Sequence, residues 1–455
     1  MKTFVFFGGT GNLFSGKIYP AFYYLLLREK LTDFRVVAVG RRFESEGNYR
    51  QFLSYTLEQN IPHVTVAVLR NLLKRTQYVR GDIGSPEDFF DFAGRAGLAD
   101  SQEILFYLAT LPSLYERFLE LLETTILPSL PTVTRKIILE KPFGTDRDSF
   151  EILDERLKKI FSEHQTYYVD HYLGKNTVKN LIILKAENLI LERLLHREYV
   201  KEVRIAVSEK GGVGKRGSFY EETGAIKDVF QNHLLQLLAL IATESPALCE
   251  EDRRECGAFL DQLNHMKSEV LRQVRLPETS QVSIGQYIGY REETNHLAST
   301  TETLVSLPLF LNSSRWKGVP FRLVTGKKMA ERRSLIEVIF HSVTEQPNRL
   351  VIEIQPEERI DLIVNAKTPG LGLFSAPVKM NFTYAGTFGG PGPEAYESIL
   401  FDCYHGDKTL FPDSEFIRLS WSLTDQLKDM LKHNHVPLEH YPPVVYQPER
   451  FWKEL

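Results

Sequence analysis

The sequence has 455 residues, of which 43% are hydrophobic and 25% are charged. This composition is typical of soluble globular proteins and excludes collagen-like, low-complexity and disordered chains. The 55 basic residues nearly balance the 59 acidic ones, so no overall positive field indicates a nucleic-acid partner. No apolar run reaches the length of a membrane-spanning helix, so no membrane contact is expected. The length predicts two domains.

Three cysteines, Cys249, Cys256 and Cys403, are too few and odd in number for a disulfide framework. The N-terminus lacks the basic, apolar and cleavage regions of a secretory signal. Both features predict a reducing, cytoplasmic location.

Short apolar runs alternate with helical stretches over residues 1–170. Strands are predicted at residues 4–7, 35–39, 104–108 and 137–139. A helix is predicted after the first strand, because apolar residues recur at helical spacing between Ile18 and Leu26. Strands that alternate with helices form parallel sheets. We therefore expect a doubly wound, Rossmann-like dinucleotide-binding domain over residues 1–170.

A glycine-rich turn lies between the first predicted strand and helix and contains Gly8, Gly9 and Gly11. Such a turn lets the backbone approach a pyrophosphate, although the spacing is not the full fingerprint and a turn without nucleotide stays an alternative. The second strand ends before Arg41 and Arg42, where NAD-selective folds carry an acidic residue. Two cations favour the 2′-phosphate of NADP, and a solvated surface pair is the alternative.

The pattern changes after residue 170. Strands are predicted at residues 203–207, 303–310, 321–325, 336–340, 350–354 and 379–384. Turns separate most of them, which predicts a mostly antiparallel sheet with helices on one face. A strongly apolar helix is predicted at residues 228–243, with His233 near its start. We expect a larger α+β domain over residues 171–455 and a site where the two domains meet.

Three local sequences carry a family resemblance: EKPFG at residues 140–144, DHYLGK at residues 170–175 and DVFQNHLLQ at residues 228–236. In this order, with the glycine turn ahead of them, they resemble the glucose-6-phosphate dehydrogenase family. The resemblance covers about residues 3–421 and suggests a divergent, bacterial-type member. It implies a coenzyme domain followed by a domain built on an extended antiparallel sheet, through which members form homodimers or homotetramers.

The resemblance implies oxidation of glucose 6-phosphate at C1 to 6-phosphogluconolactone, with hydride transfer to NADP and with NAD as a second possible coenzyme. His233 matches the family's general base, and Asp170 matches the carboxylate that orients it. Histidine titrates near neutrality, which suits this proton transfer. Without the resemblance, a histidine on an apolar helix would be interpreted as a core residue.

The resemblance also implies which residues bind the ligands. Substrate contacts are expected from Lys141, His171, Tyr172, Lys175, Glu209, Asp228, Lys327 and Gln355. Coenzyme contacts are expected from Gly8, Gly9, Thr10, Gly11, Asn12, Leu13, Arg41 and Lys141. Cations and donors in the first set suit a sugar phosphate. If their segment is helical, His171 and Lys175 share one face.

Four features depart from the family pattern. Asn12 and Asn176 stand where acidic residues are common, residues 186–188 have the sequence AEN where Phe-Ala-Asn is common, and a charged stretch at residues 192–198 replaces an expected aromatic residue. The two asparagines remove charge without removing the base or its partner. The charged stretch predicts altered packing beside the active site.

No metal site is expected, because the densest histidine group, at residues 433–440, lacks the spacing of a ligand set. Two other functions stay open. Oxidoreductases of the glucose-fructose oxidoreductase type share the dinucleotide domain, the Glu-Lys-Pro turn and the antiparallel sheet, but lack the DHYLGK sequence. A non-catalytic coenzyme-binding relative would lose the chemistry, which the retention of Asp170, Lys175 and His233 argues against.

Overall fold

A computed structural model describes residues 1–244, 257–390 and 392–444, so Cys249 and Cys256 lie outside the described residues. The chain divides into two compact units. The first unit contains residues 1–144, 148–174 and 393–414, and the second contains residues 145–147, 175–392 and 415–455. A single boundary at residue 170 does not describe this division, because the segment at 393–414 returns to the first unit.

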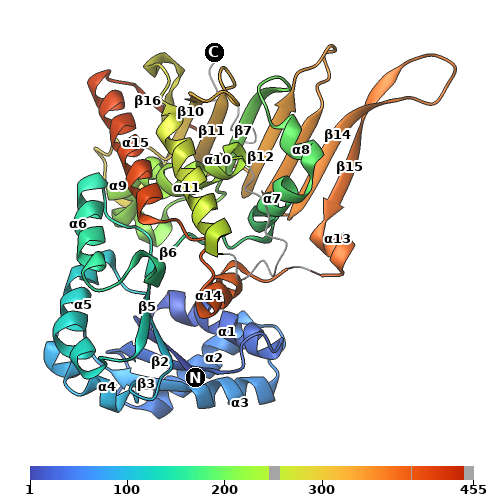
Figure 1. Ribbon diagram of the computed structural model, residues 1–455. Coiled ribbons are helices and arrows are strands. Elements are labelled where there is room, and N and C mark those ends of the chain that lie inside the picture. The colour runs from blue at the N-terminus through green and yellow to red at the C-terminus, as the bar shows by residue number, and fades with distance from the viewer. Residues whose placement is uncertain (245–256, 391, 445–455) are drawn as a thin grey trace. The chain divides into compact units, whose positions relative to one another are not determined.

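The first unit is built on a six-stranded parallel sheet (Figure 1). Its strands are β1 (Lys2–Phe7), β2 (Phe34–Gly40), β3 (Thr76–Arg80), β4 (Glu103–Leu108), β5 (Thr134–Glu140) and β6 (Thr166–Val169). The order β3-β2-β1-β4-β5-β6 is that of a doubly wound dinucleotide-binding sheet. The predicted fold of this part of the chain is therefore confirmed, and β3 and β6 are strands that the sequence pattern did not reveal.

Helices and a returning segment complete the first unit. The helices are α1 (Tyr19–Leu27), α2 (Glu46–Asn60), α3 (Val66–Arg75), α4 (Phe92–Arg95), α5 (Tyr115–Leu121), α6 (Arg147–Lys158) and α14 (Ala395–His405), with π-helical turns η1 (Phe14–Ile18) and η4 (Leu122–Ile126). Helix α14 contacts α1. Its Leu400 and Cys403 are fully buried in the same apolar cluster as Phe4, Phe6 and Phe22. Burial of these apolar side chains holds the returning segment in place.

The second unit is built on a larger mixed sheet. Its main strands run in the order β15-β14-β13-β12-β7-β11-β10-β9-β16, and β8 pairs with β10. The strands are β7 (Val200–Ser208), β8 (Val274–Arg275), β9 (Ser283–Tyr287), β10 (Leu304–Leu311), β11 (Phe321–Gly326), β12 (Arg333–Phe340), β13 (Arg349–Gln355), β14 (Arg359–Lys367), β15 (Ser375–Thr383) and β16 (Leu438–Tyr441). Apart from the parallel pairs β7–β11 and β9–β16, neighbouring strands are antiparallel. The predicted, mostly antiparallel sheet is confirmed.

Most helices of the second unit lie over one face of this sheet, and one short helix stands at the end of β15 (Figure 1). They are α7 (Asn176–Glu187), α8 (Leu189–Leu194), α9 (Gly217–Ala225), η8 (Ile226–Leu234), α10 (Leu235–Ala242), α11 (Gly257–Gln273), α12 (Tyr290–Thr294), α13 (Tyr384–Phe388) and α15 (Ser414–His433). The helix predicted at residues 228–243 is present as η8 followed by α10, and all residues of α10 are buried. Among the described residues, none of the helices combines the length and apolar character needed to cross a bilayer.

The other face of the sheet carries rows of paired charges. Arg204 on β7 pairs with Glu202 on the same strand and with Glu337 on β12, and Arg349 on β13 pairs with Glu337. These residues alternate along their strands with Val203 and other fully buried apolar side chains. The second unit therefore has one apolar, helix-covered face and one ion-paired face.

The turn at Gly8 gives a first prediction about stability. Gly8 has a φ of +93°, and a Cβ atom there would lie 2.2 Å from the carbonyl oxygen of Ala109. Gly8→Ala should therefore lower the free energy of unfolding by at least about 2 kcal/mol, because strain and a backbone clash combine. Gly16→Ala is the matched control, since a Cβ there meets nothing within 4 Å. Equal chemical-denaturation midpoints for the two variants would contradict this account.

Candidate active site

The glycine turn lies at the carboxyl ends of the central strands of the first unit. The backbone N–H groups of Gly8 and Gly9 both donate to the carbonyl oxygen of Val39, at 3.2 and 2.9 Å. A Cβ on Gly9 would lie 2.7 Å from that of Ala38, so this turn packs closely on β2. The strand order reverses between β1 and β4, which is where doubly wound sheets bind nucleotides. Residues 8–13 therefore stand at the expected coenzyme position.

The two arginines after β2 differ in their surroundings. The guanidinium of Arg42 stacks on the rings of Phe43 and Phe52, with 5.2 and 5.1 Å between its Cζ and the ring centroids. Arg41 is 79% exposed and its Nη1 lies 2.8 Å from Oδ2 of Asp82. The Thr10 side chain lies against Gly40, next to Arg41. Arg41 and Thr10, both predicted to bind coenzyme, are thus neighbours beside the end of β2.

The EKPFG sequence begins at the end of β5. The carboxylate of Glu140 accepts hydrogen bonds from the hydroxyls of Tyr107 at 2.5 Å and Tyr396 at 3.2 Å. Burial of this carboxyl group raises the pKa of Glu140 to about 7, against the lowering effect of the two tyrosine hydroxyls. Lys141 follows, is partly buried and forms a cis peptide bond with Pro142.

The DHYLGK sequence follows β6 as a turn. Asp170 is 5% exposed, its Oδ1 accepts the backbone N–H of Tyr172, and its carbonyl accepts that of Leu173. Helix α7 begins only at Asn176. The segment is not helical, so the condition under which His171 and Lys175 would share a helical face is not met.

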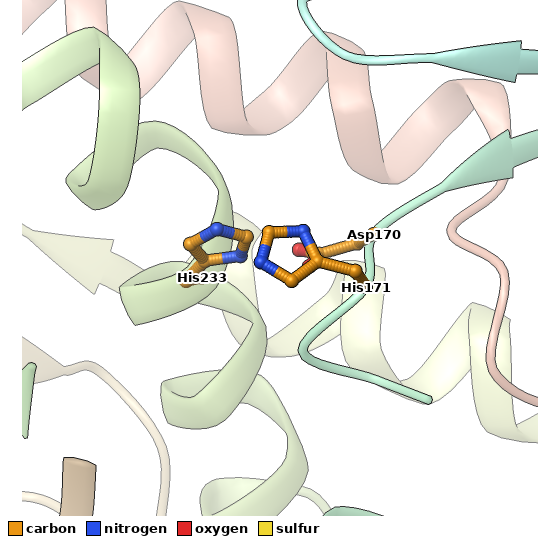
Figure 2. A group of neighbouring side chains, drawn as sticks. All are labelled: Asp170, His171 and His233. Atoms are coloured by element: carbon orange, nitrogen blue, oxygen red, sulfur yellow. The ribbon is translucent and has the colours of Figure 1, made fainter. Parts of the chain in front are cut away.

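His233 lies on η8 in the second unit and is 3% exposed. Figure 2 shows His233 on its helix, and Asp170 with His171 on the loop that follows β6. His233 is the predicted base, and Asp170 is the carboxylate predicted to orient it. The Asn232 amide donates to the carbonyl of Asp228, and its oxygen accepts the His233 backbone N–H at 2.6 Å. A π-helical turn is often found at functional sites, and here it carries Asp228 and His233 on one short element.

Two predicted substrate residues of the second unit place their carboxylates beside the ammonium group of a third. Lys327, after β11, is 2% exposed, and its Nζ lies 2.5 Å from Oε2 of Glu209 and 3.7 Å from Oδ2 of Asp228. Glu209 follows β7 and Asp228 lies on η8, so three elements supply this cluster. The Nζ also lies 4.8 Å from the ring centroid of Tyr220. Charged donors and acceptors held together in this way suit a ligand with hydroxyl groups and negative charge.

Gln355 is a further predicted substrate residue and ends β13. It is 6% exposed, and its Nε2 has no hydrogen-bond partner among the described residues. Buried amide donors are normally paired. Gln355 therefore keeps an unused hydrogen-bond donor at the end of β13.

Two family models cover the chain. The model described as glucose-6-phosphate dehydrogenase, NAD binding domain, matches residues 5–180, and the C-terminal domain model matches residues 182–453. The chain belongs to the glucose-6-phosphate dehydrogenase family. The family uses NADP, and the matched N-terminal model is the one for its nucleotide-binding domain.

Relatives and solved structures agree with this assignment. The chain is 34% identical to glucose-6-phosphate 1-dehydrogenase of Chlamydia pneumoniae, over 96% of this chain and 91% of that protein. It is 34% identical to the enzyme of that name from Borreliella burgdorferi, over 93% and 90%. A solved glucose-6-phosphate dehydrogenase in complex with its substrate glucose-6-phosphate matches with a TM-score of 0.89 and 28% identity, over 99% of this chain and 96% of that one. The Mycobacterium avium enzyme matches with a TM-score of 0.86, 28% identity and coverage of 100% and 98%.

Two of the features that depart from the family pattern, Asn176 and the charged stretch, have local physical explanations. The side-chain amide of Asn176 donates to Oε2 of Glu358 at 3.1 Å, which an acidic side chain could not do while ionised. In the charged stretch, Glu192 pairs with Arg315 at 2.7 Å, and Arg315 also donates to the carbonyl of Leu195. Arg315 therefore holds the end of α8 in place through this ion pair and hydrogen bond. Asn12 is exposed in the glycine turn.

The contacts of three side chains near the predicted site residues were not predicted from the sequence. Tyr220 lies eight positions before Asp228, and its place under Lys327 could only be found from the fold. Glu140 stands in a recognised motif, but its tyrosine partners come from β4 and α14. Asp82 lies in a region without motif matches, and no sequence signal indicated that it would contact Arg41.

The raised pKa of Glu140 predicts a pH-dependent stability. Between pH 4.5 and about 7 the native protein keeps a proton that the unfolded chain has lost, so stability falls as the pH rises through this window. Glu140→Gln cannot ionise and should remove this dependence, which amounts to at most about 3 kcal/mol. Thermal unfolding from pH 4.5 to 8 measures it, with Glu116→Gln, an exposed glutamate of α5, as the control. Parallel pH curves for Glu140→Gln and the unsubstituted protein would contradict the assignment.

Proposed function

We propose that the protein oxidises glucose 6-phosphate at C1 to 6-phosphogluconolactone, with NADP preferred over NAD as hydride acceptor. The observation that carries this proposal is the convergence of Lys327, Glu209 and Asp228 in one partly buried cluster, in a chain of the glucose-6-phosphate dehydrogenase family. The family assignment also favours this function over the glucose-fructose oxidoreductase type and over a non-catalytic relative.

The first unit is suited to hold the coenzyme. Gly8 and Gly9 leave no room for side chains against β4 and β2, so backbone alone faces the end of the sheet. We place residues 8–13 and Lys141 against the dinucleotide, with Thr10 and Arg41 toward the 2′-phosphate. When bound, the coenzyme supplies an electrophilic nicotinamide ring that accepts a hydride.

The chemistry requires a base and a charge partner. His233 takes the proton of the C1 hydroxyl while the C1 hydride departs, so the C1–O bond becomes the carbonyl of the lactone. Asp170 holds the imidazole in orientation and stabilises the imidazolium that forms. Both side chains are almost fully buried, which strengthens their electrostatic interactions by excluding water. We propose that the loop after β6 and helix η8 together form this catalytic pair.

The remaining predicted residues bind the sugar phosphate. His171, Tyr172 and Lys175 supply donors and cationic groups for the 6-phosphate. Lys327, Glu209, Asp228 and Gln355 supply donors and acceptors for the sugar hydroxyls. Lys141 lies between coenzyme and substrate. The second unit thus provides most of the sugar contacts, while the first provides the coenzyme turn and the DHY part of the phosphate site.

The reaction is tested by reduced-nicotinamide absorbance with glucose 6-phosphate and either coenzyme. His233→Asn should lower kcat by at least about 100-fold with little change in KM, because a general base acts mainly in the transition state. His164→Asn, at an exposed histidine of the same unit as Asp170, should leave turnover unchanged.

Two outcomes of this assay would contradict the proposal. One is turnover that survives in His233→Asn, and the other is a catalytic efficiency that favours NAD tenfold. The buffer contains EDTA, because Asp170, His171 and His233 are side chains of types that bind metal ions and we propose that no metal takes part.

We further propose that the protein forms a homodimer or homotetramer through the sheet of the second unit. The hairpin β14–β15 carries a row of apolar side chains that are at least partly exposed, on one face by strand alternation and register: Ile360, Leu362, Val364, Val378, Met380 and Phe382. Such a row favours contact with another copy of the chain. The free, buried Cys403 agrees with a reducing, cytoplasmic compartment, which we also propose.

A charge on the apolar row should break the assembly. Met380 is 59% exposed, so Met380→Glu should leave the fold intact and lower the molar mass measured by light scattering to that of one chain. Asn381→Glu introduces the same charge at the next position, on the opposite face of β15, and should leave the mass unchanged. A single-chain mass for the unsubstituted protein would refute the proposed assembly.

A further inference from the structure

Asp82 follows β3 and is held in place by its own loop. Its Oδ1 accepts the backbone N–H of Gly84 at 3.0 Å, and its backbone N–H donates to Oδ2 of Asp88 at 2.9 Å. The Gly81 N–H donates to the carbonyl of Gly40, which ties the end of β3 to the end of β2. The Asp82 carboxylate therefore has a fixed position beside Arg41.

The second carboxylate oxygen of Asp82 is the partner of Arg41. Its Oδ2 lies 2.8 Å from Nη1 of Arg41. The Gly84 N–H and the Arg41 guanidinium hold the pKa of Asp82 below its usual value, so this side chain is ionised at neutral pH. Arg42 is also exposed, but its guanidinium stacks on Phe43 and Phe52, whereas Arg41 follows Gly40, against which the Thr10 side chain lies.

A coenzyme 2′-phosphate must share this cation. The phosphate carries up to two negative charges and binds arginine through paired N–H donors. With Asp82 on Nη1, part of the guanidinium is already occupied and its positive charge is partly offset. An anion that approaches Arg41 also meets the fixed charge of Asp82. NAD has a hydroxyl in this position and encounters neither effect.

We propose that Asp82 is a specificity-determining residue that competes with the 2′-phosphate of NADP for Arg41 and so limits the preference for NADP over NAD. The inference rests on the proposed function, since it assumes that Arg41 faces the 2′-phosphate. It adds a residue that follows β3 to a discrimination that sequence patterns place at the end of β2. Asp82 touches Arg41 and acts on the coenzyme through it.

The test compares both coenzymes in the variant Asp82→Asn. Asparagine keeps an oxygen that can accept the Gly84 N–H, so the loop is preserved while the charge is removed. The KM for NADP should fall by about threefold, which is the screened effect of one charge on a nearby phosphate. The KM for NAD and both kcat values should stay unchanged. An unchanged or raised KM for NADP would overturn the proposal.

Two further variants separate competition from a general change of charge. Asp88→Asn removes the same charge from the same loop without touching Arg41, and should leave the ratio of the two KM values unchanged. In Arg41→Ala, the added substitution Asp82→Asn should change the KM for NADP by less than in the native background. An equal decrease in both backgrounds would show that Asp82 does not act through Arg41.

Direct titration of NADPH fluorescence tests the role of Asp82 separately from the proposed oxidation of glucose 6-phosphate. Tighter NADPH binding in Asp82→Asn, in a protein that does not oxidise glucose 6-phosphate, would support the inference and contradict the proposed function. Turnover of glucose 6-phosphate with identical NADPH affinity in both proteins would support the function and overturn the inference. Chloride salts are used throughout, since added phosphate would itself occupy Arg41.

Discussion

The turn at Gly8 is the constraint on which the coenzyme end of the first unit depends. It brings the backbone of β1 against the carbonyl of Ala109 after β4 and bonds it to the carbonyl of Val39 on β2. The three central strands of the parallel sheet are therefore joined at their carboxyl ends by one short loop. A side chain at Gly8 would separate these strands at the point where a doubly wound sheet binds its nucleotide.

A second constraint acts in the second unit, at the cluster of Lys327, Glu209 and Asp228. Burying an ammonium group is costly unless opposite charges compensate it, and Lys327 has carboxylates from two other elements beside it. Those carboxylates fix the end of β7 and the start of η8 relative to β11. Because His233 lies five positions after Asp228 on the same π-helical element, the Lys327 cluster also fixes the histidine that we propose as the base. In the proposed function, substrate binding and proton transfer therefore depend on one set of charges.

Much of the fold and the site could be predicted from sequence, because the signals were local. The strand and turn at residues 4–11 and the apolar helix that carries His233 follow from local patterns, whereas Lys327, Glu209 and Asp228 were named only through the family resemblance and their convergence was not predicted. The segment at 393–414 could not be placed, since its attachment to the first unit depends on packing of Leu400 and Cys403 against distant residues. The pairing of Asp82 with Arg41 joins residues 41 positions apart. Likewise, no periodicity could show that the DHYLGK sequence is a turn, because its shape depends on the Asp170 side chain.

Two carboxylates at adjacent strand ends show how environment assigns different roles to the same chemical group. Glu140 ends β5, and Asp170 follows β6, whose Val169 is the register partner of Glu140. Burial is the main cause of the raised pKa of Glu140, and the like charge of Asp170 adds a smaller increase to it. Glu140, enclosed by Tyr107 and Tyr396, holds its proton up to about pH 7. The carboxyl edge of the sheet then carries one negative charge where two would weaken the attraction for anionic ligands. This charge belongs to the carboxylate that we pair with the base, while the neutral Glu140 fastens α14 to the sheet through its tyrosine hydrogen bonds.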